Sequence, residues 1–437
     1  MKGNRRAIIA LFLLLSGATA LEAATHDYGL GLRLATKFYG ANRCGNASSW
    51  CHGACHTQDG QSASTDLSLG WHDCGDHIKF GQTGPYSAAA LLLGYLEFPS
   101  AYQDVASPAN SAAPSNGIPD ILDEVKYETD YLLKAVQTGR LYFQVGAAGD
   151  HNQFVEPAYQ SGLAVADGGD PRAVNSVTTG ASNVAGDVAA ALAYMSIAYR
   201  PYNAAYADQC LADAIIAFNI GDASHNTQGG VGGFYGASNW ADDMAWGAMA
   251  IYRANNLATY LTKGQQFHND GNFVMPTNWA FCYDHVEPAA VYELWRATGT
   301  AIYRTELTDE MTAYRGRQAS CGYAHLTQWA SLRYAANMAF VALLTYKVSA
   351  NAADYTFAKA NIDFILGTHS AIASNAPANF SFLIGYNVLG GGFPRAPHHR
   401  AAFGSGANWT TRWDQEVATP YSVTYVHQLD GALVGGP

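Results

Sequence analysis

Charged side chains are scarce in this sequence, and positive ones are the scarcest. Of its 437 residues 14% are charged, with 24 Lys and Arg against 35 Asp and Glu, for a net charge of −11. An acidic surface repels nucleic acids and anionic membranes, so we expect neither as a partner. The aromatic content of 12% excludes a disordered chain. A neutral polymer is a more natural partner for such a protein.

Hydrophobic runs long enough to cross a membrane are also missing. The apolar stretch 8–15 is too short for a bilayer span. Before it come the positive residues Lys2, Arg5 and Arg6, and after it the small-residue pattern Ala18-Thr-Ala20. This is the layout of a secretory signal peptide. We therefore expect a signal peptide over 1–23, and an exported monomer whose single domain covers 24–437.

Strand-like alternation is rare, and no Pro- or Ser-rich linker separates domains. Apolar residues recur instead at helical spacing, as where Ile121, Leu122 and Val125 follow Pro119 on one face. The pattern predicts about ten or eleven helices. The clearest are Tyr28–Tyr39, Ser87–Leu96, Pro119–Val136, Val184–Tyr199, Ala204–Phe218, Asp242–Asn255, Pro288–Thr298, Tyr303–Arg315, Gln328–Tyr346 and Asp354–Leu366. An all-α domain of this size must stack helices in layers to bury their apolar faces.

Cysteine is sparse and odd in number. The seven are Cys44, Cys51, Cys55, Cys74, Cys210, Cys282 and Cys321. At least one must stay unpaired within the chain. The run Cys51-His-Gly-Ala-Cys55-His56 could hold zinc, but it lacks a clear second ligand pair. Because export permits disulfides, we favour a disulfide here, with partners that the sequence leaves open.

Two carboxylates, Asp73 and Asp76, stand three residues apart in the stretch 66–81, which also holds Gly70, Gly75 and Gly81. Glycine permits bends that other residues resist, so a short loop can aim both acids at one point. Close carboxylates can activate a water, bind calcium or cap a helix.

Aromatic and imidazole side chains flank the two acids. They are Trp71, His72, His77 and Phe80. Sugars present flat apolar faces and a rim of hydroxyls, so this mixture is suited to gripping a sugar ring. We expect these four side chains to surround the acids.

The stretch Asp-Leu-Ser-Leu-Gly-Trp-His-Asp-Cys-Gly-Asp-His-Ile-Lys-Phe-Gly, 66–81, resembles the hallmark motif of glycoside hydrolase family 9, the endoglucanase and cellulase family. The resemblance implies an (α/α)6 barrel of twelve helices with its cleft across the loop end. It also implies that Asp76 is the catalytic base and that Asp73 helps hold the attacking water. Cys74 stands where the family usually has alanine.

Further blocks resemble the same family and imply sugar-contacting residues. These are His151, Phe234, Tyr235, Trp329, Arg333, His398 and Arg400. Four of them have a plainer reading: His151 in a surface loop, Trp329 and Arg333 packed in a helix four residues apart, and His398 in a polar loop or at a metal.

An acidic segment resembles a calcium site found in some members. Its oxygen ligands would be Ser238, Asn239, Asp242, Asp243 and Asp284. Asp243 replaces a longer Glu, and the alternative is a helix N-terminus with favourable acids. No cofactor is expected for the chemistry itself.

In this family the general acid is a glutamate. It lies in a segment that follows a glycine-containing sequence, or glycine phrase, similar to Gly431–Pro437. We expect that glutamate and the final barrel helix beyond Pro437, in a chain truncated at its C-terminus. Glu416 precedes the glycine phrase and lies near Pro420, which opposes a continuing helix, so it is a weak substitute.

The resemblance implies a secreted endo-β-1,4-glucanase that hydrolyses a β-1,4-glucan with inversion. Two alternatives stay open. One is a carbohydrate-binding relative with impaired catalysis, and the other is a different (α/α)6 polysaccharide-degrading enzyme.

Overall fold

Helices make up most of the structure, a computed structural model that describes 26–46, 52–105, 115–153, 155–271, 273, 275–319, 322–327, 331–368 and 381. Twelve α-helices lie in these residues: α1 (Tyr28–Ala41), α2 (Gly84–Glu97), α3 (Asp120–Ala135), α4 (Pro157–Gln160), α5 (Ser182–Tyr199), α6 (Ala204–Asp222), α7 (Ala241–Asn255), α8 (Ala258–Asp270), α9 (Glu287–Thr298), α10 (Ala301–Arg315), α11 (Ser331–Ser349) and α12 (Ala352–Leu366).

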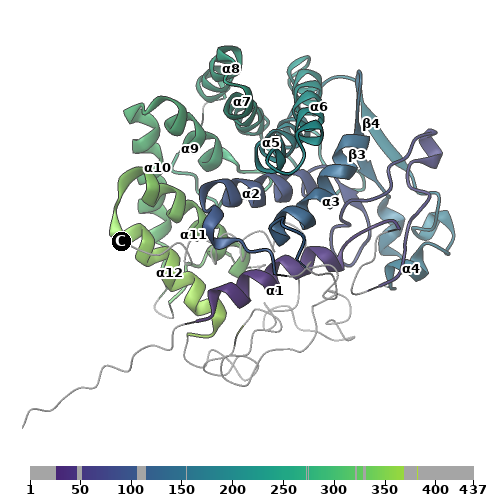
Figure 1. Cartoon of the computed structure of the whole chain (residues 1–437), viewed down its shortest axis with the longest axis horizontal. Helices are drawn as coiled ribbons and strands as arrows, with labels where there is room; N and C mark the ends of the chain where they lie inside the picture. The colour runs from purple at the N-terminus through teal and green to yellow at the C-terminus, as the bar shows by residue number, and fades with distance from the viewer. Residues whose placement is uncertain are drawn as a thin grey trace, which may run out of the picture.

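The long helices form an inner and an outer layer (Figure 1). The inner helices α2, α5, α7, α9 and α11 contact one another in that order, and the next long helix packs outside each of them. Composition explains the division: in α5, rich in Ala, every residue except Ile197 is buried, whereas α6 buries only part of its surface. Short connections join the partners of every pair except α2 and α3 and make those pairs antiparallel. The layering confirms the expected (α/α)6 barrel.

Helix α1 lies beside the end of α12 (Figure 1). The hydroxyl of Tyr28 donates to Asp363 at 2.7 Å, and Lys359 donates to the Tyr28 hydroxyl at 2.8 Å. Phe38 of α1 is buried in the core. The first and last helices of the described residues are therefore neighbours in space.

The ten predicted helices all exist, and the sequence reading missed α4 and α8. Helix α8 was missed because its sequence is polar and includes Gly264, and because it buries only Gly264, Phe267 and His268. Contact with α7 holds it: a Cβ added at Gly264 would lie 2.6 Å from Met249 Sδ. Tertiary packing here overrides weak local preference. No helix in the described ranges has the length and apolarity that a membrane span requires.

A small antiparallel sheet lies at the end of the barrel that carries the acidic loop. Strand β3 (Arg140–Val145) pairs with β1 (Lys79–Phe80), β2 (Val136–Gln137) and β4 (Val174–Val177). Because Lys79 pairs with Val145 and Phe80 with Gln144, the end of the acidic loop is fixed against β3. His151 follows shortly after β3, so the sheet brings it to the same place.

Candidate active site

The loop 66–81 is attached at both ends. At its start, Cys44 N donates to Gly70 O at 2.8 Å and His72 N donates to Asn42 O at 2.9 Å. Gly70 has φ +82, and a Cβ there would lie 2.8 Å from the Tyr131 ring, so the turn requires glycine. At its end, Gly81 lies so close to β3 that a Cβ would come within 2.5 Å of Phe143 O. The two acids therefore occupy a fixed bend.

Asp73 is 2% exposed and has three contacts that orient it. Its Oδ1 accepts from the Thr83 hydroxyl at 2.9 Å, and its Oδ2 accepts from the Tyr235 hydroxyl at 2.5 Å. Its backbone N–H donates to Ile78 O at 2.9 Å, which closes the bend across Asp76. Burial and the nearby charge of Asp76 raise the pKa of Asp73 to about 7.

Asp76 is 3% exposed and is surrounded by donors. Its Oδ1 accepts from Ile78 N at 3.1 Å, its Oδ2 accepts from the Cys74 thiol at 3.0 Å, and His151 Nε2 lies 3.4 Å from Oδ2. Burial alone would raise the pKa of Asp76, but the hydrogen bond and charge of His151, with the Cys74 and Ile78 bonds, outweigh it and lower the pKa.

The two carboxylates are thus close but electrostatically unlike. A ligand oxygen of each lies within 4.8 Å of the other and of the Cys74 sulfur. The pKa of Asp73 is raised and that of Asp76 is lowered, so Asp76 loses its proton at a lower pH than Asp73. Opposed shifts in neighbouring acids assign them different roles. The arrangement suits Asp76 to accept a proton and Asp73 to orient a water beside it.

Aromatic rings line one side of the two acids. The Phe234 ring stacks on His151 with centroids 4.2 Å apart and planes at 10°. The Tyr235 ring meets Phe80 at 5.0 Å and Tyr283 at 5.2 Å, both edge-on. Tyr283 had no distinguishing signal in the sequence, since it lies in no recognised block.

The loop that carries these two aromatics is fixed by glutamine side chains. Gln82 donates to Gln228 O at 2.7 Å, and the amide of Gln144 bonds both the N–H and the C=O of Val231, at 2.8 and 3.0 Å. Gly230 N donates to Tyr235 O at 3.0 Å. These bonds place Tyr235, whose φ is 46, where its hydroxyl reaches Asp73.

The expectation that Trp71, His72 and His77 surround the acids was wrong. They are 2%, 0% and 0% exposed, respectively, and lie behind the loop in the interior. Trp71 packs on Tyr39 at 4.5 Å and donates from Nε1 to Glu124 at 3.0 Å. The start of the loop is paired to 42–44 and covered by α1 and α3, which turns these side chains inward. Phe80, 4% exposed, packs edge-on against Phe234 and Tyr235.

A buried ion network lies behind the acids and was not predicted. Asp59 accepts from Arg172 Nε at 2.8 Å and from Nη2 at 2.7 Å, and Lys79 Nζ lies 2.7 Å from the same carboxylate. Arg172 also donates to His77 O, and Lys79 donates to Leu67 O and Leu69 O. The network therefore fixes the backbone on both sides of Asp73 and Asp76.

Of the other predicted sugar contacts, the described residues include Arg333. Arg333 lies on α11, is 6% exposed and stacks over Tyr334 at 4.1 Å. Outside the described residues lie Trp329, His398, Arg400 and Glu416.

The acidic segment before α7 is a buried carboxylate cluster. Asp284 accepts from Ser238 N at 2.7 Å and from the Ser238 hydroxyl at 2.8 Å, while Asn239 caps the helix start by accepting from Trp240 N and Ala241 N. Asp242 accepts from Val286 N at 3.0 Å. Burial, followed by neighbouring carboxylates, raises the pKa of Asp242 and Asp243 well above the usual value.

Oxygen atoms in this cluster lack hydrogen-bond partners. They belong to Asp187, Asp242, Asp243 and Glu287. Buried carboxylates without donors are costly unless they are protonated or held by a cation. Oxygen ligands alone suit calcium, so the donor set fits that ion.

Known proteins resemble this chain over nearly its whole length. The family model of glycosyl hydrolase family 9 matches residues 28–437. Endoglucanase A of Bacillus pumilus is 31% identical over 453 residues, 96% of this chain and 62% of that protein. Endoglucanase B of Cellulomonas fimi is 29% identical over 463 residues, 100% of this chain and 41% of that protein. The chain thus spans about two fifths to three fifths of these relatives.

Solved structures resemble it as well. The cellulase Cel9M of C. cellulolyticum in complex with cellobiose is 30% identical and has a TM-score of 0.80, covering 94% of this chain and 99% of that one. Endoglucanase CelQ of Clostridium thermocellum complexed with cellotetraose is 25% identical, with a TM-score of 0.75 over 94% of this chain and 72% of that one. With the family match, the paired acids and the barrel on which they lie, the chain belongs to glycosyl hydrolase family 9.

Proposed function

We propose that this protein is an endo-β-1,4-glucanase that hydrolyses its substrate with inversion. The observation that carries the proposal is the pair of buried carboxylates, each held by its own donors at one bend. Support comes from the similarity to endoglucanases and to structures with cellobiose and cellotetraose. In this chemistry one carboxylate activates a water while a separate acid protonates the leaving oxygen.

In the proposed mechanism Asp76 takes a proton from a water that Asp73 helps to orient. The water oxygen then bonds to the anomeric carbon as the bond to the leaving oxygen breaks. A protonated carboxyl ~6.5–9.5 Å from the base supplies the proton that the leaving oxygen needs. Glu416, the weak candidate for that acid, lies outside the described residues.

The substrate is proposed to be a neutral β-1,4-glucan chain. The stacked pair of Phe234 and His151 and the ring of Tyr235 lie beside the acids, where a sugar face would meet them. The net charge of −11 favours a neutral polymer over an anionic one. Trp329, Arg333, His398 and Arg400 belong to the proposed sugar contacts by resemblance.

We also propose that calcium acts structurally at Ser238, Asn239, Asp242, Asp243 and Asp284. Bound there, the ion would neutralise the buried carboxylates at the start of α7, and it has no part in the chemistry. We further propose that the protein is exported as a monomer, since 1–23 has the layout of a signal peptide.

The test compares Asp76→Asn with Asp130→Asn, a control on the surface of α3. We expect Asp76→Asn to lower kcat on carboxymethyl cellulose by ~100- to 10,000-fold while cellotetraose binding persists, since a general base contributes that much. Proton NMR of the first product should show the α anomer. An Asp76→Asn enzyme within a few-fold of wild type, or an initial β product, would overturn the mechanism.

The same assays separate the alternatives. A wild-type chain that binds cellotetraose without cleaving any glucan is the impaired carbohydrate-binding relative. A chain that cleaves another polysaccharide faster, in a panel of linkages, is a different (α/α)6 enzyme.

A further inference from the structure

The thiol of Cys74 lies beside both acids of the loop 66–81. Its sulfur is 3.0 Å from Asp76 Oδ2, and one ligand atom each of Asp73, Cys74 and Asp76 lies within 4.8 Å of the others. The two aspartates are 2% and 3% exposed, whereas Cys74 is only half-buried. The group therefore combines a soft sulfur with two hard oxygens at a point that solvent can reach.

An imidazole approaches the same carboxylate oxygen. His151 Nε2 lies 3.4 Å from Asp76 Oδ2, and the His151 side chain is 30% exposed. Stacking on Phe234, with ring planes at 10°, holds the orientation of the imidazole. Thiolate, imidazole and carboxylate are the side-chain ligands that zinc takes in proteins. Tetrahedral zinc holds neighbouring ligand atoms ~3.3–3.8 Å apart, so this group needs only small shifts to surround one ion.

The electrostatics of the group favour a cation. Burial and the charge of Asp76 raise the pKa of Asp73 to about 7, because two negative charges in one buried site repel each other. A divalent cation between the two carboxylates would offset this repulsion. Burial, followed by the charges of Asp76 and Asp73, raises the pKa of the Cys74 thiol well above its usual value. An ion that binds the sulfur must therefore displace a proton.

We propose that the two aspartates, together with Cys74 and His151, form a reversible inhibitory site for a thiophilic divalent cation such as zinc. Binding forms one Zn–S bond and releases the thiol proton to solvent, so no oxidant or reductant takes part. The inhibitory effect rests on the proposed function: with the ion on both carboxylates, Asp76 can no longer take a proton from water. Binding of the ion does not depend on that function.

The sulfur of Cys74 determines which ions the site prefers. A pair of carboxylates alone favours hard ions such as calcium and magnesium, whereas thiolate and imidazole ligands favour zinc and other soft ions. The response to zinc should therefore depend on the sulfur, and the response to magnesium should not.

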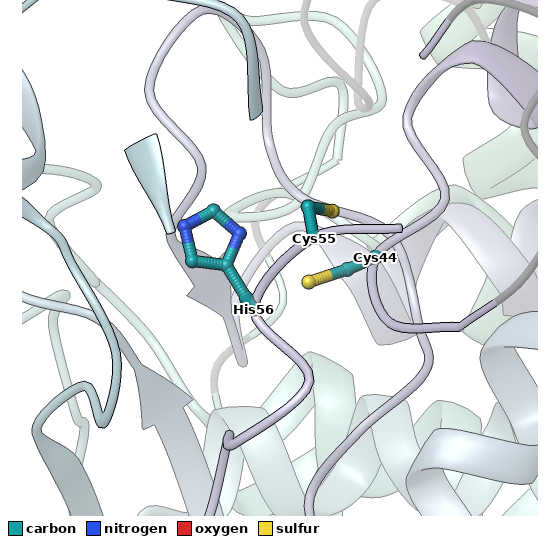
Figure 2. A group of neighbouring side chains, drawn as sticks. All are labelled: Cys44, Cys55 and His56. Atoms are coloured by element: carbon teal, nitrogen blue, oxygen red, sulfur yellow. The ribbon is translucent and has the colours of Figure 1, made fainter. Parts of the chain in front are cut away.

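A second sulfur-containing group lies behind the loop and has to be separated from the first. Cys44, Cys55 and His56 come from loop segments, as Figure 2 shows, and all three are buried. Gly45 and Cys55 form an antiparallel bridge, which brings the segments of the two cysteines together. These residues are unchanged in every variant of Cys74. Any ion that they take therefore cancels when the variants are compared with wild type.

The test titrates zinc into the full-length protein and measures both the affinity, by calorimetry, and the rate on carboxymethyl cellulose. We expect Cys74→Ser, which keeps a hydrogen-bond donor but loses the sulfur, to weaken the zinc affinity by at least ~10-fold, since removing even an outer-shell partner of a metal ligand costs that much. Zinc inhibition, relative to each protein's own rate without zinc, should weaken by the same factor. Magnesium, titrated in the same way, should not distinguish the two proteins.

Further variants keep the test sharp. Cys74→Ala and His151→Gln should each weaken zinc affinity as Cys74→Ser does, and His151→Gln lies outside the loop, so it serves if substitution at Cys74 prevents folding. The control is Cys210→Ser, a buried cysteine of α6, which should match wild type in zinc affinity and inhibition. Cobalt gives a spectroscopic readout: its thiolate charge-transfer band should be stronger in wild type than in Cys74→Ser.

Different results would overturn different parts of the proposal. Equal zinc affinity in wild type and in the variants of Cys74 and His151 would overturn the site, as would a cobalt band that does not change when the sulfur of Cys74 is removed. Zinc that binds through Cys74 but leaves hydrolysis unchanged would overturn the inhibitory role. A chain that cleaves no glucan would end the proposed function, while calorimetry and the cobalt band would still decide whether the site exists.

Discussion

The buried carboxylate of Asp59 offers a sharp test of what holds the acidic loop in place. Its side chain is 0% exposed, and those of Lys79 and Arg172 are 1% exposed. We predict that Asp59→Asn, which keeps the shape and removes the charge, strongly destabilises the protein. The asparagine NH2 would also face cationic donors, so two buried cations would lose their shared anion.

The expected magnitude follows from burial. Removing one partner of a buried ion pair costs about 3–5 kcal/mol, because the remaining charge stays desolvated without compensation. Total stability is about 5–15 kcal/mol, so this loss is a large fraction of it. The bidentate contact of Arg172 and the second cation, Lys79, place Asp59 towards the upper end of that range.

The chain contains a matched control in Asp130, on α3. Asp130 lies 2.7 Å from Lys126, the same distance as Asp59 from Lys79, but its side chain is 28% exposed. Asp130→Asn should cost about 0.5 kcal/mol or less. Urea denaturation followed by tryptophan fluorescence and circular dichroism measures both variants. Equal costs for Asp59→Asn and Asp130→Asn would refute the reasoning.

Three further predictions concern the acids themselves. His151→Gln removes the imidazole whose hydrogen bond and charge lower the pKa of Asp76, so the acid limb of kcat/KM should move to higher pH. Cys74→Ala should move that limb the same way by less than His151→Gln does, whereas Cys74→Ser, which keeps a donor, should not move it. Tyr235→Phe removes the donor to Asp73 and should lower kcat by ~10- to 100-fold with little change in stability.

Controls for these variants are available in the same chain. His225 stacks on Trp240 at 4.3 Å and lies 3.3 Å from Asp222, so it repeats the contacts of His151 away from the acids. His225→Gln should leave the pH profile unchanged. An unmoved acid limb in His151→Gln would contradict its action on Asp76. A Tyr235→Phe enzyme with the wild-type kcat would show that the hydrogen bond from the Tyr235 hydroxyl to Asp73 does not contribute to turnover.

Local patterns predicted the helices and the position of the acid pair. The ten predicted helices carry strong apolar periodicity or small-residue runs, and the family motif covers a contiguous stretch. Helix α8 was not predicted from the sequence because its stability comes from packing on α7 rather than from its own helix preference. The (α/α)6 barrel and the family assignment were both predicted correctly.

Contacts between residues far apart in the sequence could not be predicted from local patterns. Arg172 lies 113 residues from Asp59, and nothing local distinguishes it from any other arginine. The inward facing of His72 and His77 depends on pairing with 42–44, which no periodicity reveals. Cys44 could be recognised as a neighbour of Cys55 only once the segments on which they lie were paired.

The Tyr235–Asp73 hydrogen bond has a consequence for how the chain folds. It closes 162 residues of chain, whereas the partners of most helix pairs are adjacent in sequence and joined by short turns. Contacts that close long loops carry a larger entropy cost and form late, while local pairs form early. In a chain of this length the helical layers can therefore be complete in an intermediate whose acids are not yet assembled. During refolding, helicity should return before the contact between Tyr235 and Asp73 does, and mild denaturant should abolish that contact first.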